Sequence, residues 1–305
     1  MEERKKNTME TEKTTKIKPK KRRGDRRDGR LLRDVDPLHV ITPLLYPNRC
    51  DNEAYISETI DLTNINAFLE RKNANEDEFK YTLFHVIVTA MMKTLALRPK
   101  MNTFIANGRI YERYDISSSF VVKKKFSDSG AEALAIVKGE DEDNIDSIHE
   151  KIRQQVYSCR GDQLDSSTES MDIVSKLPFP ITRFVVWFCR KLDKHGLVPA
   201  SMIETDPYYT SVVLSNLGSI KLRSGYHHLT NWGTNSVFVI IGEKKMRPIF
   251  ADDGSYEMHD TVQLGMTIDE RLADGYYYSK SVRLLKTLLQ NPELLELPLN
   301  QPIDY

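Results

Sequence analysis

The pattern of apolar and polar positions predicts a chain of mixed strands and helices. Short segments with alternating or continuous apolar residues are predicted to be strands, at 54–60, 104–111, 118–126, 132–138, 209–214, 236–243 and 262–268. Segments with apolar residues every three or four positions are predicted to be helices, at 63–71, 82–98, 144–156, 179–194 and 276–290. The polar segment 161–170 is predicted to be a loop. Strands and helices do not alternate regularly and no repeat is visible, which favours one α/β domain on a mixed sheet.

Local signals set several boundaries of these elements. Thr63 is the expected N-cap of its helix, and Thr82 is expected to start the next one. Asn107-Gly108 predicts a tight hairpin turn, because both residues tolerate the positive φ angles that such a turn needs. Pro99 and Pro292 are expected to end the helices that precede them.

Composition places the chain among ordinary globular proteins. Apolar residues make up 40% and charged residues 29% of it, and its formal net charge is zero. Three cysteines lie far apart, without a Cys-x-x-Cys pair, which argues against a disulfide framework or a metal site. The run Ile181–Cys189 contains Arg183 and is far shorter than the roughly 20 apolar residues that span a bilayer. We therefore expect no membrane span, a buried or interface helix at this run, and a cytoplasmic location.

The first 30 residues differ from the rest, with 13 Lys or Arg against 6 Asp or Glu by direct count. Because the segment has few apolar residues, we predict a disordered basic tail over 1–30 and a single domain over 31–305. The basic cluster Lys18–Arg23 is compatible with nucleic acid or anionic lipid. A solvated tail is the simpler interpretation, so nucleic acid is not expected as a partner.

Three motifs in the second half of the chain carry a family resemblance. These are the turn Ser215-Asn216-Leu217-Gly218, the segment Gly242–Pro248, and Asp269-Glu270-Arg271-Leu272-Ala273-Asp274-Gly275 after the last predicted strand. In this order they resemble the catalytic half of coenzyme A-dependent acyltransferases of the chloramphenicol acetyltransferase and dihydrolipoamide acyltransferase superfamily. Earlier in the chain, Ile60–Thr63 before a predicted helix and Pro99–Asn102 followed by Asn107–Ile110 resemble the same family. The resemblance covers about residues 54–297 and is dense only after residue 208.

The resemblance implies a fold and a site. The fold would be a two-layer α/β sandwich, with helices packed on one face of a mixed sheet, assembled into a homotrimer. Coenzyme A or its acyl thioester would be a substrate and would meet a thiol or hydroxyl acceptor at the subunit boundary. Ser215, with Asn216 beside it, would stabilise the oxyanion of the tetrahedral intermediate. Asp274 would hold the active-site loop through an arginine partner.

The sequence departs from the family at its general base, since Glu270 stands where the family has histidine. A carboxylate accepts protons, but its reference pKa of about 4.3 is roughly two units below that of histidine. Burial beside apolar walls would raise that value. Either Glu270 is a substitute base, or the chain is a pseudoenzyme that retains the trimer for coenzyme A binding or for assembly with a partner.

Each candidate also has a purely structural interpretation. Ser215 and Asn216 are common turn residues, and Asp274 suits a helix N-cap. Glu270 would pair with Arg271, or with a basic residue of a neighbouring subunit, and take no part in chemistry. His227 and His228 offer an alternative base, although a histidine pair is more often part of loop structure. Because about thirty residues, mostly charged, precede the predicted domain, we expect neither a lipoyl nor a peripheral-subunit-binding domain there. The acceptor is therefore expected to be a small molecule or a lipoyl group carried by another protein.

Overall fold

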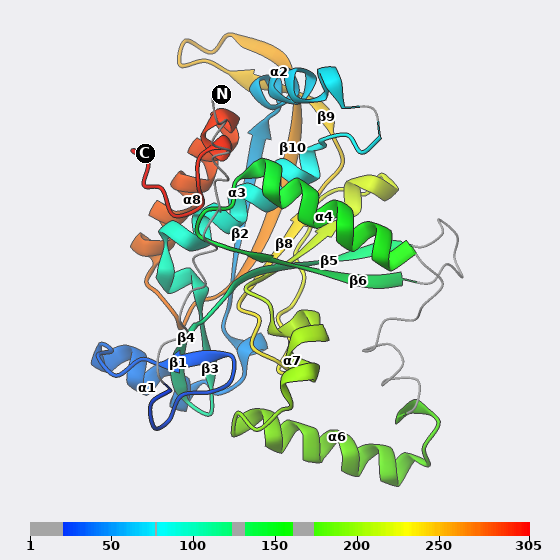
Figure 1. Cartoon of the computed structure of the whole chain (residues 1–305). Helices are drawn as coiled ribbons and strands as arrows, with labels where there is room; N and C mark the ends of the chain where they lie inside the picture. The colour runs from blue at the N-terminus through cyan, green and yellow to red at the C-terminus, as the bar shows by residue number, and fades with distance from the viewer. Residues whose placement is uncertain (1–20, 77, 124–131, 161–173) are drawn as a thin grey trace, which may run out of the picture.

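A seven-stranded mixed sheet forms the centre of the computed structural model, which describes residues 21–76, 78–123, 132–160 and 174–305 (Figure 1). Its strands lie in the order β2 (Glu53–Asp61), β10 (Tyr256–Asp269), β8 (Val237–Ile241), β7 (Val212–Asn216), β5 (Ile116–Lys123) and β6 (Glu132–Gly139), and β9 (Lys245–Phe250) pairs with β10. β7 runs parallel to β5 and β8, whereas the other pairs are antiparallel.

A smaller sheet lies at one end of the molecule. It contains β1 (Gly29–Leu31), β4 (Arg109–Arg113) and β3 (Thr103–Ala106). β3 and β4 form the predicted hairpin, and its turn residues Asn107 and Gly108 have φ angles of 50° and 70°. The Asn-Gly signal for this turn is therefore confirmed.

Four helices cover one face of the large sheet: α2 (Thr63–Lys72), α3 (Leu83–Leu97), α4 (Ile145–Arg160) and α8 (Gly275–Gln290) (Figure 1). Three further helices of the described residues, α1 (Pro37–Leu45), α6 (Phe179–Lys194) and α7 (Ala200–Thr205), lie outside this layer. The predicted two-layer sandwich, with helices on one face of a mixed sheet, is confirmed.

The two faces of the sheet have different cores. The large core joins the four helices to side chains such as Val212, Leu214 and Ile268. On the other face, Val213 and Phe238 join a small cluster with Leu229, which comes from an irregular segment lying directly on the sheet. That segment approaches so closely that a Cβ atom at Gly265 would lie 2.0 Å from the carbonyl oxygen of Gly225. Glycine at position 265 allows this contact.

Some element boundaries differ from prediction. β7 begins at Val212 rather than residue 209, because Pro207–Tyr209 forms a 3₁₀ turn. β10 begins at Tyr256, six residues before the predicted strand, because it continues into a hairpin with β9. Asp61 caps the backbone at the start of α2, accepting from the Thr63 amide at 2.8 Å, so the prediction of Thr63 as the cap is wrong. Residues 124–126 and the loop 161–170 lie outside the described residues.

The predicted disordered tail over 1–30 is too long. Residues 1–20 lie outside the described part of the chain, but Arg26 and Gly29 are buried against the domain. Arg26 is 4% exposed and donates to the Asp193 carbonyl at 2.6 Å and to the Asp28 carboxylate at 2.9 Å. A composition argument counts arginine as a polar residue that favours disorder. Arg26 instead fixes this segment to the domain, because its guanidinium pairs with the carboxylates of Asp28 and Asp193.

A buried histidine at the start of α3 gives a prediction for stability. The Nδ1 atom of His85 accepts from the Thr82 amide at 3.0 Å, which completes a capping box, and Nε2 is buried without a partner. Burial, with His149 nearby, lowers the pKa of His85 to about 3. The folded state thus keeps the ring neutral, whereas the unfolded chain protonates it below about pH 6.5.

We expect the free energy of unfolding to fall between pH 6.5 and 3, with about 2 kcal/mol lost by pH 5 through this group. Urea unfolding at pH 7 and pH 5 measures the loss, and His85→Gln, which cannot titrate there, should reduce it. An equal loss in both proteins would show that His85 is not responsible.

Candidate active site

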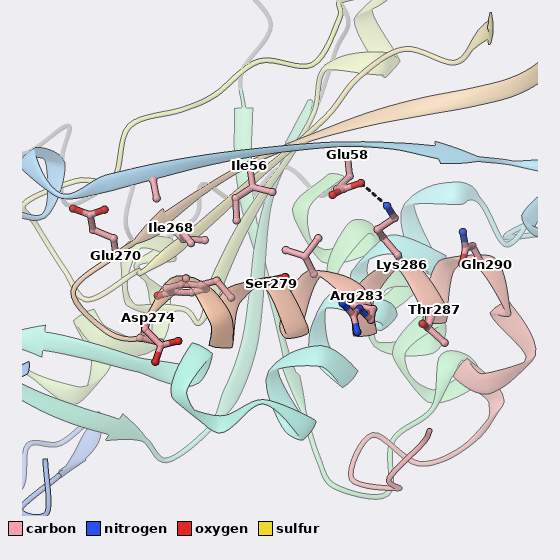
Figure 2. Close-up of a pocket in the computed structure, with 15 residues that line it drawn as sticks. Ile56, Glu58, Ile268, Glu270, Asp274, Ser279, Arg283, Lys286, Thr287 and Gln290 are labelled. Atoms are coloured by element: carbon pink, nitrogen blue, oxygen red, sulfur yellow. Dashed lines mark ion pairs between the residues drawn. The ribbon is translucent and has the colours of Figure 1, made fainter. Parts of the chain in front are cut away.

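A groove of about 700 Å³ lies between β2, the end of β10 and α8 (Figure 2). Ala54, Ile56 and Ile268 form its sheet wall, and Tyr278 and Val282 contribute from α8. The polar side chains at one end are Glu270 and Asp274, and those at the other are Glu58, Lys286 and Gln290. Its size is within the usual range for small-molecule sites, about 300–1,000 Å³.

Glu270 is the first residue after β10 and is exposed. Its backbone amide donates to the Asn52 carbonyl at 3.0 Å, which fixes the main chain at the mouth of the groove. The side chain makes no hydrogen bond or ion pair with the described residues. Burial beside apolar walls would adapt a carboxylate to proton transfer. A single chain does not provide such burial for Glu270.

Further along the groove, two basic residues of α8 differ in whether they form an ion pair. Lys286 pairs with Glu58 at 2.9 Å, so its charge is compensated (Figure 2). Arg283 lines the same wall and has no carboxylate within ion-pair distance among the described residues. Within the described part of the chain, the guanidinium of Arg283 is thus a cation that the groove can offer to a ligand.

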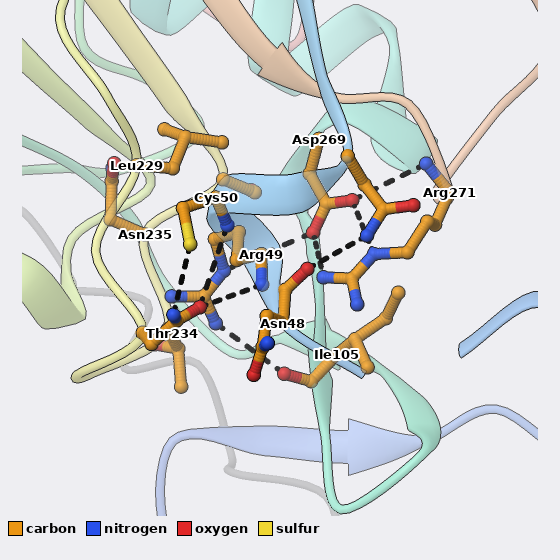
Figure 3. Close-up of polar contacts among 12 residues, drawn as sticks. Asn48, Arg49, Cys50, Ile105, Leu229, Thr234, Asn235, Asp269 and Arg271 are labelled. Carbon is orange, nitrogen blue, oxygen red and sulfur yellow. Dashed lines mark hydrogen bonds and ion pairs between the residues drawn. The ribbon is translucent and has the colours of Figure 1, made fainter. Parts of the chain in front are cut away.

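A buried ion cluster holds the turn on which Glu270 lies (Figure 3). The Asp269 carboxylate accepts from the Arg271 guanidinium twice, at 2.7 Å and 2.6 Å, and Arg49 Nε lies 3.8 Å from it. Arg271 also donates to the Tyr46 carbonyl at 2.7 Å, and Arg49 to the Thr230 carbonyl at 2.6 Å. Because Asp269 is fully buried, the cluster connects β10 rigidly to the segments around Tyr46 and Thr230.

Sequence reasoning missed the importance of this cluster. Asp269 and Arg271 belong to the quoted motif, but only Glu270 and Asp274 were assigned roles in it. The available signal was a pair of opposite charges two positions apart, with Asp269 as the last residue of β10 and Arg271 in the turn after it. Nothing in the sequence indicated that Arg49, about 220 positions earlier, would join it.

Asp274 is the N-cap of α8. Its Oδ1 atom accepts from the Tyr277 amide at 2.7 Å, which confirms the N-cap interpretation. The arginine partner implied by the resemblance is not found among the described residues, where Asp269 holds Arg271 instead. Asp274 therefore stabilises the turn from the helix side.

We expect Asp274→Ala to lower the free energy of unfolding by about 1 kcal/mol, because one amide at the start of α8 loses its acceptor. Thermal or urea unfolding measures it, and Asp274→Asn, which can still cap, should retain most of the stability. Equal losses in the two variants would contradict the capping role.

Ser215 lies on the other face of the sheet. Val212 and Leu214 of β7 enter the helix-side core, whereas Val213 belongs to the opposite cluster, and alternation places Ser215 with Val213. Through Ile240, Ser215 aligns with Gly265 on β10, five residues before Glu270. That separation is about 16 Å along the strands and about 10 Å across them. A single chain therefore does not bring Ser215 and Glu270 together.

The two histidines lie on the face of Ser215, whereas Asn216 is the last residue of β7. Asn216 begins a 3₁₀ turn, in which its side chain accepts from the Ser219 amide at 3.3 Å. His227 stacks on Phe238 with ring centroids 4.2 Å apart, and its Nδ1 atom lies 2.8 Å from the His228 carbonyl oxygen. Since Phe238 pairs with Val213, His227 is on the same face as Ser215 and not in the groove of Glu270.

Comparison with known proteins shows where the chain is recognisable. Residues 206–297 match the family model of the 2-oxoacid dehydrogenases acyltransferase (catalytic domain). This region contains β7, β8, β10, α8 and all the candidate residues. No curated protein sequence matches the chain.

Known structures resemble the whole described fold. The cubic core of the pyruvate dehydrogenase multienzyme complex superposes with a TM-score of 0.57 at 14% identity, covering 87% of this chain and 94% of that one. For the dihydrolipoamide acetyltransferase (E2p) of Azotobacter vinelandii, the TM-score is 0.56 at 14% identity, with coverage of 87% and 94%. For a chloramphenicol acetyltransferase, it is 0.52 at 13% identity, with coverage of 86% and 99%. At these identities the likeness shows a common fold.

Proposed function

We propose that this chain is an acyl-coenzyme A-dependent acyltransferase, which transfers an acyl group between coenzyme A and a thiol or hydroxyl acceptor. One observation carries the proposal. The segment that matches an acyltransferase catalytic domain contains Glu270, which directly follows β10 and lies at the mouth of a groove. In the Azotobacter vinelandii enzyme, the catalytic roles of a serine, a histidine and an asparagine were investigated, the last two four positions apart. Glu270 and Asp274 have the same spacing.

The proposed chemistry divides among three residues. The Glu270 carboxylate takes the proton from the acceptor thiol or hydroxyl as its sulfur or oxygen attacks the thioester carbonyl. Ser215, at the turn that also contains Asn216, donates a hydrogen bond to the oxyanion of the tetrahedral intermediate. The coenzyme A thiolate then leaves and receives the proton from Glu270. Asp274 keeps the start of α8 in place.

This division requires more than one copy of the chain. Ser215 and Glu270 of one chain are on opposite faces of the sheet, so the serine that serves a given Glu270 must come from a neighbouring copy. We therefore propose a homotrimer with its sites at subunit boundaries. The same boundary would cover the exposed Glu270 and provide the missing apolar surroundings. The likeness to the cubic core of a multienzyme complex supports assembly of this kind.

The exposure of Glu270 also supports a second candidate, a pseudoenzyme that binds coenzyme A or a partner without turnover. The reference pKa of glutamate is roughly two units below that of histidine. This difference would raise the activation free energy by about 3 kcal/mol if it were fully expressed in the transition state. In this case the fold and the groove are retained while the transfer is lost.

One set of measurements separates the two candidates. Release of the coenzyme A thiol from acetyl-coenzyme A is followed with a panel of thiol and hydroxyl acceptors that includes dihydrolipoamide. Acceptor-dependent release is expected for the transferase, whereas thermal stabilisation by coenzyme A without release indicates the pseudoenzyme. Sedimentation equilibrium tests the trimer. A protein that stays monomeric at assay concentrations contradicts the shared site.

A further inference from the structure

Most side chains of helix α6 are exposed to solvent. None of its residues is buried, and it extends away from both layers of the domain (Figure 1). The exposed fractions are 62% for Phe184, 53% for Trp187 and 48% for Phe188. The prediction that this helix is buried is therefore wrong. Its exposed apolar side chains remain available to a binding partner.

The side chains of α6 are arranged on two faces. Ile181, Phe184 and Phe188 recur at the spacing that aligns residues on one side of a helix. Arg190, Lys194 and Arg183 lie on the opposite side, and all three are exposed. Lys191 lies on the border between the faces with its ammonium 5.9 Å from the Trp187 ring.

The single acidic residue of α6 is already engaged. Asp193 lies 3.2 Å from the Arg26 guanidinium and accepts from the Tyr209 hydroxyl at 2.9 Å. The helix therefore presents four cations and no available carboxylate. A second copy of α6 would offer apolar side chains but no acidic partner for these cations, which favours an occupant that is itself negative.

A second apolar helix borders the same region. A groove of about 810 Å³ separates the two helices on the cationic side of α6: Pro43 and Leu44 line it from α1, and α6 contributes Phe179, Val186, Trp187, Arg183, Arg190, Lys191 and Lys194. On α1, Leu38, Ile41 and Leu45 are also exposed, by 69%, 50% and 67%. α1 itself adjoins the turn of Glu270, because His39 Nδ1 lies 2.9 Å from the Arg271 carbonyl oxygen, so the apolar side chains of α1 lie beside the proposed subunit boundary.

We propose that α6 docks this protein onto an anionic lipid bilayer surface. An amphipathic helix with aromatic residues on one face and Arg or Lys beside them binds the headgroup boundary through apolar burial and attraction to anionic lipid. A helix of 16 residues is about 24 Å long, shorter than the hydrocarbon core of about 30 Å. In the described part of the chain, no helix has the length and apolar character to cross a membrane. The helix therefore lies in the interface.

Vesicle binding tests the proposal with the full chain. Co-sedimentation is measured with vesicles of phosphatidylcholine containing about one third phosphatidylglycerol, and with pure phosphatidylcholine. We expect about tenfold or stronger partitioning onto the anionic vesicles and a decrease at high salt. Trp187 supplies a direct signal, because its exposed indole should shift its emission to shorter wavelength on binding. The other tryptophan, Trp232, already donates to Asp206 at 2.6 Å within the fold.

Matched variants assign the binding to α6. The pair Phe184→Ser and Phe188→Ser should lower partitioning about tenfold or more, whereas Phe250→Ser, an equally exposed phenylalanine on β9, should not. Arg183→Glu with Arg190→Glu should lower it similarly, against Lys244→Glu as the control. All these proteins retain residues 1–20, so a difference between them does not come from that basic segment.

Absence of binding, or binding unchanged by the phenylalanine pair, would overturn the proposal. The same applies if that pair instead dissociates an oligomer in the absence of lipid.

Discussion

Replacing Glu270 by alanine is expected to lower the turnover of acyl transfer by about 10²- to 10⁴-fold, the usual contribution of a positioned general base. The thiol or hydroxyl of the acceptor would then lose its proton to water, which is neither positioned nor basic enough. Since the exposed Glu270 side chain forms no bond with the described residues, the variant should fold normally. The measurement is coenzyme A thiol release under saturating acyl donor and acceptor.

Two further substitutions sharpen this prediction. Glu270→Gln keeps the shape but cannot accept a proton, so it should resemble alanine. Glu270→His supplies the base with the better matched pKa and should retain or raise turnover. If Glu270→Ala retains full turnover while His227→Ala or His228→Ala abolishes it, the base is on the loop that covers the opposite face. Turnover unaffected by any of these changes would refute a base at either place.

Local signals in the sequence predicted most of the elements but not their pairing. Asn107-Gly108 specified its hairpin because both residues tolerate the turn conformation, whatever the surroundings. α8 was predicted from its apolar spacing and its stop at Pro292. β9 and the first part of β10 were missed, because their side chains are largely exposed and the hairpin is held by backbone pairing. Short helices such as α1 carry too few periods to be recognised.

The candidate site was predictable only where its parts are close in sequence. Glu270 and Asp274 occur in one motif, and the structure places both at one end of the same groove. The relation of Ser215 to Glu270 depends on the strand order and on the register across β7, β8 and β10. A register slip of one residue would move a side chain to the other face of the sheet. Only the paired strands show that the two side chains leave opposite faces, and hence that a shared site needs two copies of the chain.

Asp269→Ala should destabilise the fold by about 3–5 kcal/mol, the largest loss of stability that we expect from a single change. The carboxylate is fully buried, so its removal leaves the Arg271 and Arg49 guanidinium groups buried without their counter-ion. Burial already lowers the pKa of Arg49, which shows that its charge is costly in this environment. Urea unfolding followed by circular dichroism measures the loss. Asp252→Ala, at an exposed position, should change stability by less than about 0.5 kcal/mol.

A double substitution distinguishes loss of the ion pair from loss of shape. Asp269→Leu with Arg271→Met removes both charges of the close pair and should destabilise less than Asp269→Leu alone, because one buried guanidinium no longer lacks a partner. Arg49 remains in both proteins, and its bonds to the Thr230 and Gly233 carbonyls, at 2.6 Å and 3.1 Å, keep it in place. If the double variant is no more stable than the single one, the coupling between positions 269 and 271 is too weak to hold the turn. The position of Glu270 would then depend on the cap at Asp274 and on contacts with a neighbouring subunit.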